Sequence, residues 1–335
     1  MPAFAFIGLI LTWVGPAGAG TLQAVKSAGE LRCGVVTEEY DYSKDQTHGN
    51  MSAFGTDICK AVTAAVLGTG GKLVLSSFPD EKHGLNAVKS GNIALLAGAT
   101  PLVTLGAIYD VSFGRPFFLD GQGFIVVAAK GINSIDSLAG KEVCFLDNTE
   151  AATTLAAVLH ARHINYLPFP FQEQGEMDAA LIAGRCAAMT GDVSQLANSR
   201  ANMHARVSAF VILPELISLD PLAPAFRNDD PQWAAIVDWT LYATIQAEAS
   251  GITRANVDAT SESDDLVINR WLTKAGGLSR ALGLSDDWAV QVIKAVGNYG
   301  EMFAKRAGKQ SPLQLDRGMN ALWTKGGLLY PLPGR

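Results

Sequence analysis

Two polar segments of the chain lie where a small charged solute could bind. Asp192 closes the predicted strand CAAMTGD, and a carboxylate at that strand end could hold an ammonium group. Asn148 and Thr149 open a predicted helix, whose free backbone N–H groups could bind a carboxylate. N-capping of the following helix explains either segment equally well. Both segments therefore stand as candidates for ligand binding.

A third candidate is the aromatic and acidic segment TEEYDYSKDQTHGN at residues 37–50. Tyr40 or Tyr42 could cover a ligand at the mouth of a cleft, where an aromatic ring attracts a cation. A solvated turn is the simpler interpretation of the same segment.

The motifs typical of metal and catalytic sites are missing from the sequence. His160 and His163 lie three residues apart on a predicted helix, but no third ligand is near them, so a solvated helix face is favoured. The sequence contains no nucleophile elbow, phosphate loop or HExxH motif. We therefore expect no metal, no cofactor and no enzymatic activity.

The elements that must position these residues alternate between strand and helix in two stretches of the chain. ELRCGVV, KLVLSSF and NIALLAG read as strands separated by helices, and the pattern recurs from about residue 125. Two such α/β units with largely parallel sheets imply a cleft between them. Ligands collect at the carboxyl ends of parallel strands, which predicts binding at residues 97–100, 146–149 and 191–192. The last hundred residues are mainly helical, and the stripe of Trp288, Val292, Val296, Tyr299 and Phe303 reads as core.

Length and composition indicate an exported globular protein. The chain has 335 residues, which favours two globular units, and its net charge of −6 is spread without a basic run that could bind nucleic acid. Residues 1–20 form an apolar segment that ends in small residues, which is typical of a signal peptide; an uncleaved membrane anchor is the alternative. We expect a periplasmic location.

The four cysteines fit an oxidising compartment. Cys33, Cys59, Cys144 and Cys186 allow three pairings and show no C-x-x-C spacing. Because two lie early and two lie later, one bridge in each unit is expected, Cys33 with Cys59 and Cys144 with Cys186.

The chain resembles the periplasmic general L-amino-acid-binding proteins of polar amino acid ABC transporters. The resemblance is carried by TLQAVKSAGELRCGV, DGQGF, LPELIS, DWAVQVIKAVGNYGEMF and RGMNALWTKGGLLYPLP. It implies a type II periplasmic binding fold, in which two lobes close on a solute about a hinge, with a helical C-terminal extension. It also implies a monomer that delivers its solute to an inner-membrane permease. The implied boundaries are 21–124 and 222–335 for lobe 1 and 125–221 for lobe 2.

The resemblance also assigns ligand-binding residues, although unevenly. Asp192 matches an aspartate that binds the ligand's amino group, and Thr100 and Thr149 match threonines beside the ligand. Asp57 falls on a retained acidic position, and Glu150 replaces an expected threonine.

The arginine that grips the ligand's carboxylate in this family is missing. Leu105 stands at its position, Ala97 stands at that of an upstream arginine, and no lysine or arginine occurs from Ser90 to Gly114. A bidentate arginine is the strongest directional contact that such a site offers to a carboxylate. The sequence therefore predicts a cleft suited to a cationic solute, such as an amine; the alternative is that Arg115, or another cation that the alignment does not place, binds the carboxylate instead.

Three functions are weighed on this basis. The first is capture of a small polar or cationic solute for an ABC-type uptake system. The others are a sensor that binds a ligand other than an amino acid, and a dehydratase-like enzyme on the same scaffold. The enzyme hypothesis requires a buried Glu150 within reach of substrate, so an exposed Glu150 would argue against it.

Overall fold

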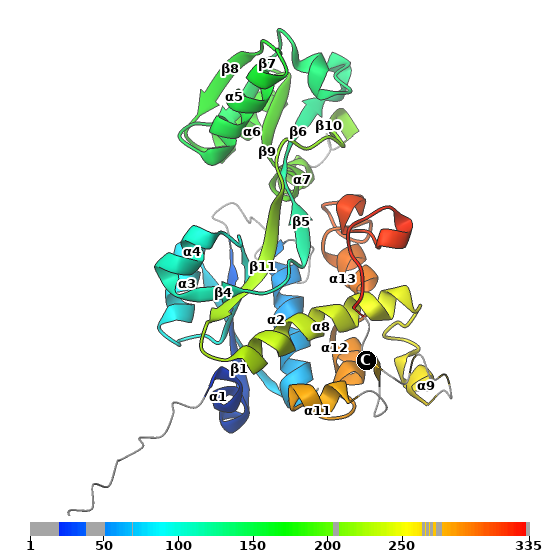
Figure 1. The fold of residues 1–335 in the computed structure, drawn as a ribbon. Coiled ribbons are helices and arrows are strands. Elements are labelled where there is room, and N and C mark those ends of the chain that lie inside the picture. The colour runs from blue at the N-terminus through cyan, green and yellow to red at the C-terminus, as the bar shows by residue number, and fades with distance from the viewer. Residues whose placement is uncertain are drawn as a thin grey trace, which may run out of the picture.

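The chain forms two α/β lobes, one above the other in Figure 1, connected by strands that pass from one to the other. The computed structural model describes residues 20–37, 51–68, 70–203, 208–262, 265, 268, 271–272 and 277–332. Each lobe has its own mixed sheet covered by helices. The α/β architecture predicted for both units is therefore present.

The first lobe is built on a six-stranded sheet of order β2-β1-β3-β11-β4, with β5 paired to β11 outside this path. β1 runs parallel to β2 and β3, whereas β11 runs antiparallel to β3, β4 and β5. The prediction of a largely parallel sheet is correct for β1–β3 and wrong for the other half, because β11 enters from the second lobe. The strands are β1 (Glu30–Val36), β2 (Lys72–Phe78), β3 (Leu95–Ala99), β4 (Val111–Phe113), β5 (Phe118–Asp120) and β11 (Asp220–Arg227).

The second lobe is built on a five-stranded sheet of order β10-β6-β9-β7-β8. β7 runs parallel to β8 and β9, and β6 runs antiparallel to β9 and β10. The prolines of β8 are tolerated because it is an edge strand. The strands are β6 (Gln122–Val127), β7 (Glu142–Leu146), β8 (Leu167–Phe171), β9 (Ala188–Asp192) and β10 (Phe210–Ile212).

The chain crosses between the lobes twice. β5 leads through Gly121 directly into β6, and the return runs from β10 to β11 (Figure 1). The strands of the second sheet therefore all come from residues 122–212, an insertion within the first lobe. The helices of this insertion are α5 (Glu150–Ala161), α6 (Gln174–Ile182) and α7 (Val193–Asn202).

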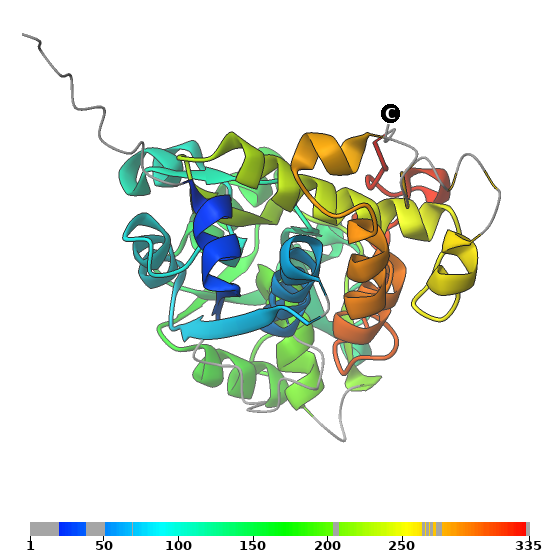
Figure 2. The same ribbon diagram turned by 90° about the horizontal axis from the view of Figure 1, so that it is seen from below.

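The first lobe carries most of the helices. Figure 2 shows α8, α12 and α13 beside α2, and α2 packs against all three as well as against β1 and β3. Because α2 lies between sheet and helices, it is apolar around most of its circumference. The α-helices of this lobe within the described residues are α1 (Thr21–Ala28), α2 (Met51–Leu67), α3 (Glu81–Lys89), α4 (Val103–Tyr109), α8 (Pro231–Ala249), α9 (Val257–Ser261), α11 (Leu278–Leu282), α12 (Trp288–Val296) and α13 (Tyr299–Arg306).

The apolar stripe predicted near the C-terminus is core, as expected, but it lies on two helices. Gly297 ends α12 with φ of 83°, a conformation that favours glycine. Asn298 then begins α13 with a capping box formed with Glu301. The Tyr299 hydroxyl donates to the Phe117 carbonyl oxygen over 2.7 Å, which ties this segment to the strand region before the crossing.

Each lobe contains one disulfide within the described residues. Cys33 of β1 is bonded to Cys59 of α2, and Cys144 of β7 is bonded to Cys186 just before β9. These are the pairs suggested by the grouping of the cysteines in the sequence. Neither bond joins one lobe to the other, so the covalent restraints act within the lobes.

A buried ion pair joins α2 to α13. Arg306 Nε donates to Asp57 Oδ2 over 2.7 Å, and Arg306 Nη2 donates to Asp57 Oδ1 over 2.9 Å. The two side chains are only 5% and 7% exposed, so each charge depends on the other for compensation. Lys60, which is half exposed, lies 3.7 Å from the same carboxylate.

Replacing Arg306 with methionine should destabilise the fold, because it leaves the Asp57 carboxylate buried without its bidentate partner. We expect the free energy of unfolding to fall by about 3 kcal/mol, measured by urea denaturation. The matched control Lys60→Met should cost less than about 1 kcal/mol, since its charge is solvated. A loss for Arg306→Met no greater than that of the control would contradict a stabilising role for the pair.

Candidate functional site

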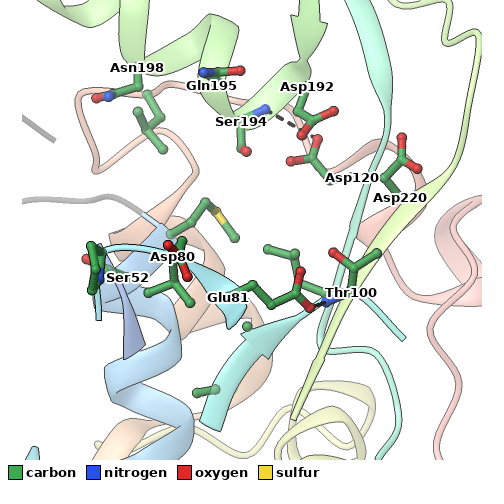
Figure 3. Close-up of a pocket in the computed structure, with 17 residues that line it drawn as sticks. Ser52, Asp80, Glu81, Thr100, Asp120, Asp192, Ser194, Gln195, Asn198 and Asp220 are labelled. Atoms are coloured by element: carbon green, nitrogen blue, oxygen red, sulfur yellow. Dashed lines mark hydrogen bonds between the residues drawn. The ribbon is translucent and has the colours of Figure 1, made fainter. Parts of the chain in front are cut away.

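A cavity of about 310 Å³ lies between the lobes and is the candidate binding site (Figure 3). The first lobe contributes the start of α2, the end of β3 and the turn that leads from β2 into α3. The second lobe contributes Asp192 and the first turns of α7, and the crossing strands contribute Asp120 and Asp220. The carboxyl ends of β3 and β9 thus face the cavity, as the sequence predicted.

The lining of the cavity is acidic. Among the described residues that line it there is no lysine, arginine or histidine, and there are five carboxylates. They are contributed by Asp80, Glu81, Asp120, Asp192 and Asp220. Neutral polar side chains complete the wall, namely Ser52, Thr100, Ser194, Gln195 and Asn198. Such a lining lowers the energy of a cation and raises that of an anion.

Glu81 is the first residue of α3, and it reaches across the cavity wall to the end of β3 (Figure 3). The backbone N–H of Thr100 donates to Glu81 Oε1 over 2.6 Å. Burial raises the pKa of the Glu81 carboxyl, and the backbone and side chain of Thr100 partly offset this. The partly buried Glu81 carboxylate therefore accepts the hydrogen bond of the main-chain N–H at the end of β3.

Asp80 caps the same helix. Its Oδ1 accepts from the His83 backbone N–H over 2.9 Å and lies 2.8 Å from the His83 ring nitrogen Nδ1. The Asp80 side chain is about half exposed, at 51%. Asp80 thus has a local partner and a capping function that explain its position.

Asp120 and Asp220 lie directly opposite each other where β5 pairs with β11. Asp120 is buried, and its Oδ1 accepts from Gly121 N–H over 2.9 Å and from Ser194 N–H over 3.3 Å. Asp220 accepts a short hydrogen bond from the Ser218 hydroxyl. Like charges at facing positions of a sheet pair are unfavourable, and both of these carboxyl groups also act on Asp192 or are acted on by it.

The carboxyl groups at the crossing have raised pKa values. Burial raises the pKa of Asp120 to about 7, and the charge of Asp192 adds to the rise. Burial also raises the pKa of Asp192 to about 6, with further contributions from Asp220 and Glu150. The Asp192 side chain is exposed to the cavity itself, but the surrounding walls remove much of the bulk water around it.

The C-terminal extension closes one side of the cavity. Leu313 is a buried lining residue, and its carbonyl oxygen accepts from Arg200 Nη2 of α7 over 2.7 Å. Arg200 belongs to the second lobe, whereas Leu313 follows the helices of the first. A hydrogen bond therefore connects the extension to the opposite lobe beside the site.

The structure separates the sequence candidates into two groups. Thr100 and Asp192 line the cavity. Asp57 does not; the expectation of a ligand contact there is corrected, because its carboxylate is buried against Arg306. Tyr40 and Tyr42 lie outside the described residues.

Thr149 and Glu150 lie outside the cavity as well. Thr149 is the N-cap of α5, since its hydroxyl accepts from Ala152 N–H and donates to the Leu146 carbonyl oxygen. Glu150 is exposed and borders an open hollow formed around the start of α5. The capping interpretation of this segment is therefore the one that the contacts support.

The two positions at which the resemblance places arginines are also apolar in the structure. Leu105 packs on α4 against the core of the first lobe, and Ala97 lines the cavity without a charge. Arg115 does not replace the missing cation: it is exposed and stacks over the Tyr242 ring at 4.8 Å. The alternative that Arg115 grips the ligand is therefore not supported.

Comparison with known proteins identifies the family. The general L-amino acid-binding periplasmic protein AapJ of Rhizobium johnstonii is 39% identical over 99% of this chain and 98% of its own length. The chain belongs to the periplasmic amino-acid-binding proteins of ABC transporters. No family model matches the sequence.

Two further relatives extend the comparison. The glutamate/glutamine/aspartate/asparagine-binding protein BztA of Rhodobacter capsulatus is 35% identical over 99% of this chain and 98% of its own. A solved periplasmic binding protein from Brucella ovis with glutathione bound is 36% identical, with a TM-score of 0.78 over 95% of this chain and all of its own. The predicted two-lobed type II fold and the role as the solute-binding component of an ABC uptake system are thereby confirmed.

Membership of these binding proteins also accounts for the periplasmic location. Within the described ranges, no helix has the length and apolarity needed to cross a membrane. The residues of the predicted signal peptide, apart from Gly20, lie outside the described residues.

Several cavity residues were not among the sequence candidates. Asp80 and Glu81 follow β2, whose carboxyl end lies at the same sheet edge as that of β3, so the strand-end rule could have found them. Asp120 belongs to the DGQGF motif, and Asp220 begins β11. Their pairing follows from the antiparallel crossing, which has no signal in the local sequence.

The raised pKa of Asp120 makes stability depend on pH. Between its ordinary pKa of 3.8 and the folded value of about 7, the folded protein holds a proton that the unfolded chain has released. The free energy of unfolding should therefore fall as pH rises through this window, by up to about 1.4 kcal/mol per pH unit from this group.

Asp120→Asn should flatten this dependence in the ligand-free protein, because asparagine keeps the acceptor oxygen and removes the titration. Urea denaturation at intervals from pH 4.5 to pH 8 measures the slope. Asp136→Asn, at a carboxylate that is 81% exposed, serves as the control and should match wild type. A slope that is the same in Asp120→Asn and wild type would show that Asp120 ionises normally.

Proposed function

We propose that this binding protein captures a small cationic solute in the cavity between its lobes. The observation that carries the proposal is the lining: five carboxylates and, within the described part of the chain, no cationic side chain. A cation placed there is paired with carboxylates, while an anion meets repulsion and finds no partner of opposite charge. Amines and amino acids with a cationic side chain are the solute class that fits.

The ligands printed in the names of two relatives are anionic or uncharged overall at neutral pH. Glutamate, aspartate and glutathione carry a net negative charge, and glutamine and asparagine, which the name of BztA also includes, carry no net charge. Here Ala97 and Leu105 provide no positive charge at the positions where the resemblance places arginines. We infer that the scaffold and transport role are shared with these relatives and that the ligand preference is shifted towards cations.

Delivery to an inner-membrane permease completes the proposed function. Closure would take place about the two segments in which the chain crosses between the lobes. Lobe 1 would comprise residues 21–124 and 222–335, and lobe 2 would comprise residues 125–221. The crossings near Gly121 and before Asp220 support this division. We further propose a monomer, exported by cleavage of the N-terminal segment.

The same proposal holds that the protein binds its solute without catalysing a reaction. The sequence singled out Glu150 as the acid or base that a dehydratase-like reaction would need. In the structure it is exposed and does not line the cavity, so no sequence candidate for that role faces a bound solute.

A thermal-shift and calorimetry panel on the mature protein tests the ligand class. Lysine, arginine, putrescine and agmatine represent cations, and glutamate and glutathione represent anions. At a hundredfold excess over Kd, a bound cation should stabilise the protein by about 2.7 kcal/mol, and the anions should leave the melting temperature unchanged.

Asp192→Asn should weaken binding of the best cation by about tenfold or more, because it removes one charge-assisted contact. The exposed Asp136→Asn variant is the control and should bind as wild type does. Binding of glutamate or glutathione with no response to any cation would overturn the proposal.

A further inference from the structure

Three main-chain N–H groups at or beside the cavity are already bonded to oxygen atoms of the protein itself. Thr100 N–H, at the end of β3, donates to Glu81 Oε1 over 2.6 Å. On the opposite lobe, Ser194 N–H donates to Asp120 Oδ1 over 3.3 Å, and Val193 N–H donates to the Gly121 carbonyl oxygen over 3.0 Å. Donors of this kind, at strand ends and helix starts, are the ones that commonly bind a ligand carboxylate.

We propose that Glu81 is a built-in anion that takes the place of a ligand carboxylate, so that the solute is an amine without a carboxylate group. This inference rests on the proposed function, because it narrows the cationic class to one kind of cation. Glu81 is the specificity-determining residue: its side chain extends from α3 to the Thr100 amide and presents its charge to the cavity (Figure 3).

The charge around Glu81 supports the same conclusion. Only the backbone and side chain of Thr100 favour its ionised form, and no cationic side chain in the described lining compensates it. Asp80, in contrast, has the His83 backbone and ring as partners. An ammonium group in the cavity would thus supply the compensation that Glu81 lacks within the described structure.

A ligand carboxylate would meet two obstacles at this wall. It would have to displace Glu81 from the Thr100 amide, and it would add a further negative charge beside Glu81, Asp120 and Asp192. Because one charge-assisted hydrogen bond changes affinity by about tenfold to hundredfold, the penalty is large enough to set specificity.

Matched ligand pairs that differ only in the α-carboxylate test the inference directly. Putrescine is compared with ornithine, cadaverine with lysine, and agmatine with arginine, by titration calorimetry on the mature wild-type protein at pH 8. The best amine should bind at least about tenfold more tightly than its amino acid partner.

Two variants of Glu81 separate the effect of its negative charge from the effect of its hydrogen bond with the Thr100 amide. Glu81→Gln keeps an acceptor for the Thr100 amide and removes the charge, so amine affinity should fall by about tenfold. Glu81→Ala also frees the amide, so the amino acid should gain affinity and the preference within each pair should shrink towards one. Asp136→Asn, which removes an exposed carboxylate outside the cavity, is the control and should leave the preference within each pair unchanged.

The outcomes distinguish this inference from the proposed function. If cations bind but amine and amino acid bind equally, or if Glu81→Ala leaves the preference unchanged, the role of Glu81 is wrong while the cationic cavity stands. If none of the six probes binds a protein that unfolds cooperatively, both proposals fail. The comparison of ligand pairs on the wild-type protein tests the inference by itself, so the test does not depend on whether a variant folds.

Discussion

The pairing of β5 with β11 places Asp120 opposite Asp220 at the point where the chain crosses between the lobes. Strand register allows neither residue to move away from the other without breaking the ladder that joins the lobes. Asp120 is therefore held by two backbone N–H groups, and Asp220 by the Ser218 hydroxyl. The same strand pair therefore connects the lobes and supplies negative charge to the site.

This arrangement trades stability for function. Carboxylates that repel each other in a poorly solvated cavity cost the ligand-free protein free energy, and the surrounding scaffold offsets that cost. The scaffold is well suited to do so, because α2 is buried among α8, α12 and α13, and a disulfide links it to β1. The proposed cationic solute would relieve this repulsion and so favour the loaded form over the empty one.

Much of the fold was predictable from the sequence, and the reasons for the exceptions are physical. Strands such as NIALLAG and CAAMTGD have compact apolar runs, and Thr100 and Asp192, at their carboxyl ends, line the cavity. Asp57 was misassigned because its partner Arg306 lies 249 residues further along the chain, a separation that no local pattern bridges. Glu81 has the plain appearance of a helix-starting residue, and only the parallel pairing of β1 with β2 and β3 brings it to Thr100.

The insertion of the second sheet between β5 and β11 has a consequence for the order in which the protein is assembled. Every strand of that sheet, and both cysteines of its disulfide, are present once the chain has emerged to Ile212. The first lobe must wait, because β11 occupies its sheet and α8, α12 and α13 cover α2. During N-to-C export the inserted lobe can therefore fold and oxidise as a unit, while the lobe that begins the chain is the last to be completed.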